Sequence, residues 1–182
     1  TKEKFNIERA LDDFIAIASQ NTNKDSLGPI LGMSSAYMFL KQQQRAKNQL
    51  KRVVKTPWNF DDAEYLEKCW LLLADQYIQS NKLESANELI TKVVQHNKSC
   101  TKALEYLGYI AEKDHRYKDA ANTYLQAWKS GGKTNPSVGY KLAYCLMKSK
   151  KYPQAIDTAN EVLEISPEYH NVKKDILDKC MN

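Results

Sequence analysis

A recurring spacing of small residues limits the folds that this chain of 182 residues can adopt. Three copies of the pattern pair Ala74 with Ala86, Gly108 with Ala120, and Ala143 with Ala155. The second alanines of successive copies are 34 and 35 residues apart, and a weaker copy ends at Ala46. A sequence period of this length is typical of proteins built from stacked helical or β-turn repeats.

Each copy is expected to form a hairpin of two antiparallel helices. Small side chains let two helix backbones approach closely, so we assign the first small residue of a copy to the first helix and the alanine to the second. Larger apolar residues flank them at the i, i+3, i+4 spacing of an amphipathic helix, as Leu104 and Leu107 do. Only six glycines and five prolines are present, too few for a turn-rich β sandwich.

The landmarks match the tetratricopeptide repeat, and we predict an all-α, right-handed solenoid of such hairpins with a C-terminal capping helix. We predict five regions along the chain. They are the second helix of a truncated repeat plus a loop at 1–26, a degenerate hairpin at 27–54, an insertion and entry to the next repeat at 55–66, three regular repeats at 67–169, and the capping helix at 170–182.

The sequence offers no pattern for catalysis, a cofactor or a metal. The four cysteines are far apart and form no CxxC pair, which favours a reducing compartment over a disulfide framework. His96 and Cys100 could share a helix face, but a structural zinc site needs about four ligands. The segment 127–134 is one residue away from a phosphate-binding loop, but a helix is expected before it instead of a strand.

The first helices of such repeats line a concave groove, and the residues at groove positions are candidates for binding a partner. These candidates are Lys102, Tyr106, Tyr109, Tyr140, Lys141 and Tyr144. Tyrosine is enriched at interfaces because it combines an apolar ring with a polar hydroxyl. The alternative is that these tyrosines pack against neighbouring helices of the same chain.

A basic stretch from Lys41 to Lys55 contains six lysines and arginines and no acidic residue. Such a stretch could bind phosphate groups of nucleic acid, or microtubules or acidic lipid. The more common arrangement is an amphipathic helix with a solvated basic face. We expect no nucleic-acid partner, and no membrane insertion because no apolar run approaches the ~20 residues of a span.

Several stretches together carry a more specific resemblance. They include LGMSSAYMFLKQ at 31–42, the KTPWNF insertion at 55–60, EKCWLLLADQYIQS at 67–80 and EYLGYIAEKD at 105–114. These stretches resemble the C-terminal end of the tetratricopeptide repeat protein 21 family, which supplies the large tetratricopeptide-repeat subunit of intraflagellar transport complex A.

The resemblance implies a non-enzymatic scaffold that acts in retrograde ciliary transport and in the import of ciliary membrane proteins. The implied partners are other subunits of the complex, namely the β-propeller-plus-solenoid subunits and the small disordered subunit. The implied location is the cytoplasm and the cilium or flagellum, including the axoneme and basal body. The alternative is an adaptor in another cytosolic assembly that holds a short peptide or a partner helix in its concave groove.

Overall fold

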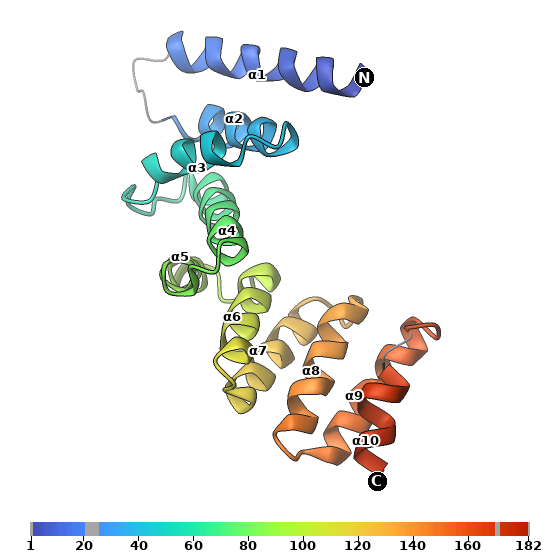
Figure 1. Ribbon diagram of the computed structural model, residues 1–182. Helices are drawn as coiled ribbons and strands as arrows, with labels where there is room; N and C mark the ends of the chain where they lie inside the picture. Colours follow the sequence, from blue (N-terminus) through green and yellow to red (C-terminus); the bar gives the residue numbers. More distant parts are fainter. Residues whose placement is uncertain (1, 21–25, 170–171, 182) are drawn as a thin grey trace. The chain divides into compact units, whose positions relative to one another are not determined.

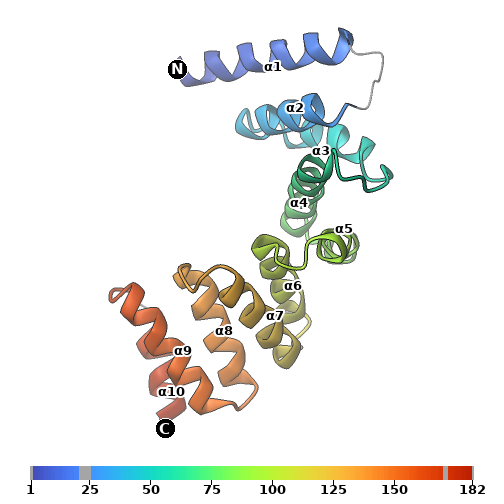
Figure 2. The ribbon, with the colours of Figure 1, turned by 180° about the vertical axis from the view of Figure 1, so that it is seen from behind.

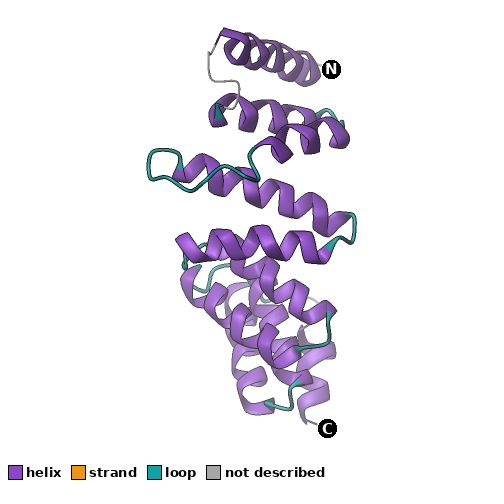
Figure 3. Cartoon of the chain, turned by 90° about the vertical axis from the view of Figure 1, so that its left-hand side faces the viewer, coloured by secondary structure: helices purple, strands orange, loops and turns teal. Residues whose placement is uncertain are grey.

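The computed structural model describes residues 2–20, 26–169 and 172–181, and these residues form only helices and loops (Figure 3). The prediction of an all-α chain is therefore confirmed. Figure 1 labels the helices. Their bounds are α1 Lys2–Gln20, α2 Leu27–Phe39, α3 Gln43–Arg52, α4 Ala63–Gln79, α5 Leu83–His96, α6 Thr101–Lys113, α7 Tyr117–Ser130, α8 Pro136–Lys148, α9 Tyr152–Ile165, and α10 Asp178–Met181, which follows a π-helical turn at Lys173–Leu177.

The turns inside the hairpins share one backbone geometry. One residue in each adopts a left-handed conformation, with φ between 54° and 60°, at Lys41, Asn81, His115 and Lys150. The next residue donates its N–H back to the end of the first helix, as Arg116 does to the Ala111 carbonyl at 2.9 Å. This hydrogen bond belongs to the Schellman motif, which ends many helices.

The same turns explain the spacing of the alanines. The residue that closes each Schellman motif also accepts the first hydrogen bond of the second helix, and the donor is the landmark alanine. Ala120 donates its N–H to the Arg116 carbonyl at 3.0 Å, and Ala155 donates to the Lys151 carbonyl at 3.0 Å. The alanine therefore lies in the first turn of the second helix.

The chain divides into two compact units, one up to Ile90 and the other from Thr91 onward. In the first unit, α1 packs on α2, and α3 and α4 pack on each other and on α2. The small residues Ala46, Ala74 and Ala86 are completely buried. The indole N–H of Trp70 donates to the Val53 carbonyl at 3.3 Å, which ties α4 to the end of α3.

In the second unit, α6, α7, α8 and α9 pack in sequence, each on the next, and Figure 2 shows α8 beside α9. Ala120, Ala143 and Ala155 are completely buried in its core. Gly108 is also buried, but its nearest neighbour is the ring of Tyr124, one helical turn beyond Ala120. The absence of a side chain at Gly108 thus makes room for an aromatic ring.

The last described helical segment closes the core of the second unit. The π-helical turn packs on both α8 and α9, and α10 packs on α9. Val172 and Ile176 are completely buried against that core. The predicted capping helix covers 170–182, of which 170, 171 and 182 lie outside the described residues.

Candidate protein-interaction surface

Helix α6 presents three of the six candidate groove residues. Lys102 is exposed, whereas Tyr106 and Tyr109 are half-buried. The Lys102 ammonium lies 4.8 Å from the centre of the Tyr106 ring and 3.5 Å from a carboxylate oxygen of Glu105. These contacts lie at the start of the helix. The rings of Tyr106 and Tyr109 both remain partly accessible.

Helix α8 presents the other three candidates, all of them half-buried. The Lys141 ammonium lies 5.9 Å from the ring centres of both Tyr109 and Tyr124. Lys113 approaches the Tyr109 ring to 5.3 Å. Cation–π attraction acts over such distances, so Lys141 joins α8 to the Tyr109 side of α6. We call the surface formed by Lys102, Tyr106, Tyr109, Tyr140, Lys141 and Tyr144 the α6–α8 face.

Two aromatic residues that the sequence did not single out for binding complete a tyrosine cluster at the α8 side of this face. Tyr140 and Tyr144 stack with their ring centres 6.4 Å apart. Tyr117, at the start of α7, meets Tyr144 edge-on at 6.4 Å, and Tyr169, after α9, lies 5.8 Å from Tyr140. The sequence pattern of the groove covers only the first helix of each repeat, so it does not include Tyr117 or Tyr169.

Tyr140 has an internal partner. Its hydroxyl donates to a carboxylate oxygen of Asp175 at 3.1 Å, which ties α8 to the π-helical turn. Burial and then this hydrogen bond raise the pKa of Tyr140 to about 12. Tyr140 is therefore held by contacts within the chain. Tyr109 and Tyr144 carry lysines beside their rings, Lys148 lying 5.4 Å from the Tyr144 ring.

Comparison with known proteins decides the family. The model of the tetratricopeptide repeat protein 21 C-terminal ARM domain matches residues 1–181. This chain belongs to the tetratricopeptide repeat protein 21 family. Tetratricopeptide repeat protein 21B of Mus musculus is 54% identical over 180 residues, which are 99% of this chain and 14% of that protein. The homolog in Caenorhabditis elegans is 40% identical over 182 residues, again 99% of this chain and 14% of the relative. The chain thus spans about a seventh of the length of these relatives.

Solved structures of other repeat proteins share the fold of this family member. A MamA double mutant superposes with a TM-score of 0.72 at 16% identity, covering 90% of this chain and 87% of that one. YrrB, described as a tetratricopeptide-repeat protein with an unusual peptide-binding site, gives a TM-score of 0.71 at 12% identity, covering 94% of this chain and 84% of YrrB. The predicted tetratricopeptide-repeat solenoid class is therefore confirmed.

Two buried cysteines of this family member, Cys69 and Cys145, are poor nucleophiles. Burial raises the pKa of Cys69 to about 12, and burial raises that of Cys145 to about 12 as well. The thiolate is the reactive form, so both thiols are inert at neutral pH. In the part of the chain that the structure describes, no group of three or more His, Cys, Asp or Glu side chains could hold a metal ion.

His96 and Cys100 belong to different places in the chain fold. Helix α5 ends at His96, whereas Cys100 directly precedes α6, so these residues do not share a helix face. The segment 127–134 ends α7 and turns toward α8, with Gly132 in a left-handed conformation at φ 63°. Across residues 2–20, 26–169 and 172–181, no helix is long and apolar enough to cross a membrane.

Proposed function

We propose that this chain is a non-enzymatic scaffold segment of intraflagellar transport complex A. In this role it contributes to retrograde ciliary transport and to the import of ciliary membrane proteins, in the cytoplasm and in the cilium or flagellum, including the axoneme and basal body. Its partners are the β-propeller-plus-solenoid subunits and the small disordered subunit of the complex. The observation that carries the proposal is the match of the family model to residues 1–181.

The geometry supports a role in holding other proteins. The α6–α8 face combines half-buried tyrosine rings with exposed or half-buried lysines, and aromatic residues are enriched at protein interfaces. One carboxylate lies among them, because Glu105 approaches the Lys102 ammonium to 3.5 Å. A surface of this kind suits a partner helix or segment with apolar and acidic side chains.

Cross-linking mass spectrometry on the intact cellular assembly tests this proposal. We expect lysines of the α6–α8 face, Lys102 and Lys141, to link to sibling subunits of the complex. Lys129, which is exposed on α7, serves as the comparison within the same unit. If the assembly yields no link between this chain and any complex A subunit, the proposal is wrong.

The second candidate function is peptide recognition by the α6–α8 face in another cytosolic assembly. The observation that favours it is the position of Tyr109 between the ammonium groups of Lys113 and Lys141, which suits an acidic peptide. A recognition module binds its peptide while monomeric, and Tyr109→Ala should then weaken binding by about 1–2 kcal/mol or more. Tyr152→Ala, which removes an exposed tyrosine from α9, is the matched control.

A further inference from the structure

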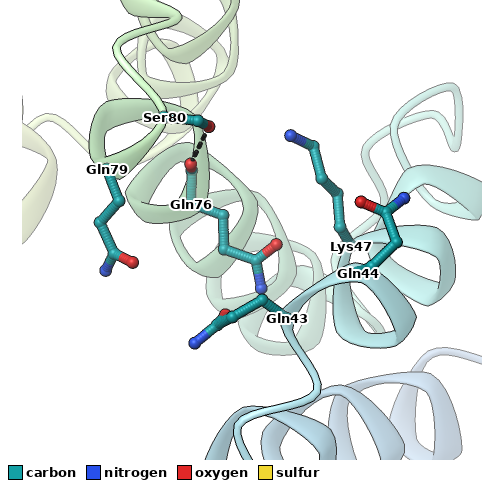
Figure 4. A pocket seen from close by; sticks show the side chains of 6 residues that line it. All are labelled: Gln43, Gln44, Lys47, Gln76, Gln79 and Ser80. Atoms are coloured by element: carbon teal, nitrogen blue, oxygen red, sulfur yellow. Dashed lines mark hydrogen bonds between the residues drawn. The ribbon is translucent and has the colours of Figure 1, made fainter.

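A pocket lined by polar residues lies between the start of α3 and the end of α4 (Figure 4), within the first unit, whereas the α6–α8 face belongs to the second. Its volume is about 260 Å³. Amide side chains and one lysine dominate its lining. The lining residues are Gln43, Gln44, Lys47, Gln76, Gln79 and Ser80.

Gln76 is the unusual residue of this pocket. The residue is only 5% exposed. Among the described residues, neither its amide nitrogen nor its amide oxygen has a hydrogen-bond partner. Figure 4 shows the carboxamide pointing toward α3, where Gln43 and Lys47 stand. Buried polar groups are nearly always paired with protein, ordered water or a bound group, so the Gln76 amide marks a place beside the pocket where a bound group can add hydrogen bonds.

Lys47 supplies a positive charge beside Gln76. Its ammonium lies 4.5 Å from the centre of the Tyr77 ring, and within the described part of the chain it makes no ion pair. Partial burial, followed by the charges of Lys82 and Lys51, lowers the pKa of Lys47. The attraction of a carboxylate in the pocket would offset these unfavourable effects.

The start of α3 adds to the positive potential. Gln42, the residue before this ten-residue helix, makes no side-chain hydrogen bond to cap it. The first N–H groups of a helix carry a partial positive charge that favours anions. Gln43 and Gln44 are these first residues, and the stretch from Lys41 to Lys55 contains no acidic residue. On the α4 side, the amide of Gln79 already donates to the Asp75 carboxylate at 2.6 Å.

The chemistry of Gln76 decides the class of ligand. A carboxamide offers one acceptor and two donors, and a peptide group offers a donor and an acceptor that pair with it. An anion without a donor, such as sulfate or the phosphodiester group of a nucleic-acid backbone, would leave the Gln76 carbonyl oxygen unpaired. The pocket volume is just below the range of about 300–1,000 Å³ for small-molecule sites, which suits one side chain and a neighbouring peptide group.

We infer that this pocket binds an extended acidic segment of a partner protein, with a peptide group on the Gln76 carboxamide and a carboxylate between Lys47 and the start of α3. The inference rests on the proposed scaffold function because a partner protein must supply the segment. It adds a second binding site on a different unit from the α6–α8 face.

Nuclear magnetic resonance titration of the chain with blocked hexaglutamate tests the site directly. We expect saturable shifts of the Gln76 and Gln43 side-chain amide signals. Blocked hexaglutamine should bind about tenfold more weakly, because a charge-assisted hydrogen bond is lost. Inorganic phosphate is the third probe. Shifts with phosphate and none with hexaglutamate would replace the inference with an anion site, and hexaglutamate binding that leaves the pocket signals unmoved would also overturn it.

Three variants separate binding from folding. Gln76→Leu removes an unpaired buried amide, so we expect equal or higher thermal stability together with about a tenfold or greater loss of hexaglutamate affinity. Lys47→Gln should weaken binding, whereas Lys51→Gln, which removes the same charge from the same helix outside the pocket lining, should have a smaller effect. Full binding by Gln76→Leu would show that the unpaired amide has no ligand.

The outcomes distinguish this site from the proposed function. A chain that cross-links to complex A subunits but binds no hexaglutamate retains the scaffold function without this pocket. If the pocket binds hexaglutamate but the chain cross-links to no complex A subunit, the pocket stands as a binding site and its partner belongs to another assembly.

Discussion

Gly108 shows how one missing side chain sets the packing of a hairpin. A Cβ atom added there would lie 2.7 Å from the ring of Tyr124, which is completely buried and hydrogen-bonded to Glu112. The ring has little freedom to move, so the backbones of α6 and α7 would have to separate. Packing in the second unit thus depends on glycine at this position.

We therefore predict that Gly108→Ala lowers the free energy of unfolding by about 1–3 kcal/mol, as overpacking of a core typically does. Urea denaturation followed by circular dichroism measures this change. Gly28→Ala is the control, because its Cβ would meet the Tyr65 ring at an ordinary 3.8 Å. Equal stability of Gly108→Ala and the unsubstituted chain would contradict the close approach of α6 and Tyr124.

The π-helical turn and α10 depend on a few contacts to α8 and α9. The burial of the apolar side chains of Val172 and Ile176 holds this segment on the core. The hydrogen bond from the Tyr140 hydroxyl to Asp175 is a second attachment. Because the pKa of Tyr140 rises from about 10 in an unfolded chain to about 12 in the folded one, folding favours the protonated phenol. Its contribution is complete below the unfolded pKa and is lost as the pH rises through the folded pKa.

Tyr140→Phe tests this attachment. We predict a loss of about 0.5–1.5 kcal/mol at neutral pH, the usual net value of one hydrogen bond. The difference in unfolding free energy between the two proteins should shrink as the pH rises from about 10 to about 12. Hydrogen exchange of the amides in 172–181 should also become faster. Tyr152→Phe, at an exposed position of α9, should change neither measurement.

The sequence was sufficient to predict the helices but not the sites where they meet. Ala86, Ala120 and Ala155 each lie in the first turn of a second helix. The recurrence of these small side chains was therefore enough to predict the hairpins. The pairing of Tyr117 with Tyr144 depends on how α7 packs on α8, which no spacing within one repeat records. The burial of Gln76 likewise depends on the packing of α3 beside α4, which the sequence around Gln76 does not reveal.

The charge of the chain as a whole favours protein partners over nucleic acid. The net charge is only +5, and the bases of the stretch from Lys41 to Lys55 are partly engaged within the fold. The Arg45 guanidinium lies 6.0 Å from the Tyr37 ring centre and donates to Gln42, and Arg52 donates to Gln49 at 2.8 Å. Two of the six basic side chains are therefore held by contacts within the chain, and the net charge of the whole chain is modest.

We predict that a labelled single-stranded RNA binds this chain no more tightly than the ~10⁻⁴–10⁻⁶ M typical of non-specific association at physiological salt. Fluorescence anisotropy measures this affinity. A single-stranded RNA site in which all six basic side chains contact phosphates would lose about 300-fold in affinity between about 50 mM and about 200 mM salt. Lys51→Gln is an informative companion, because it removes one of these bases without altering the Gln76 pocket lining. Tight binding with a steep salt dependence that Lys51→Gln reduces would show that α3 serves nucleic acid instead of a protein.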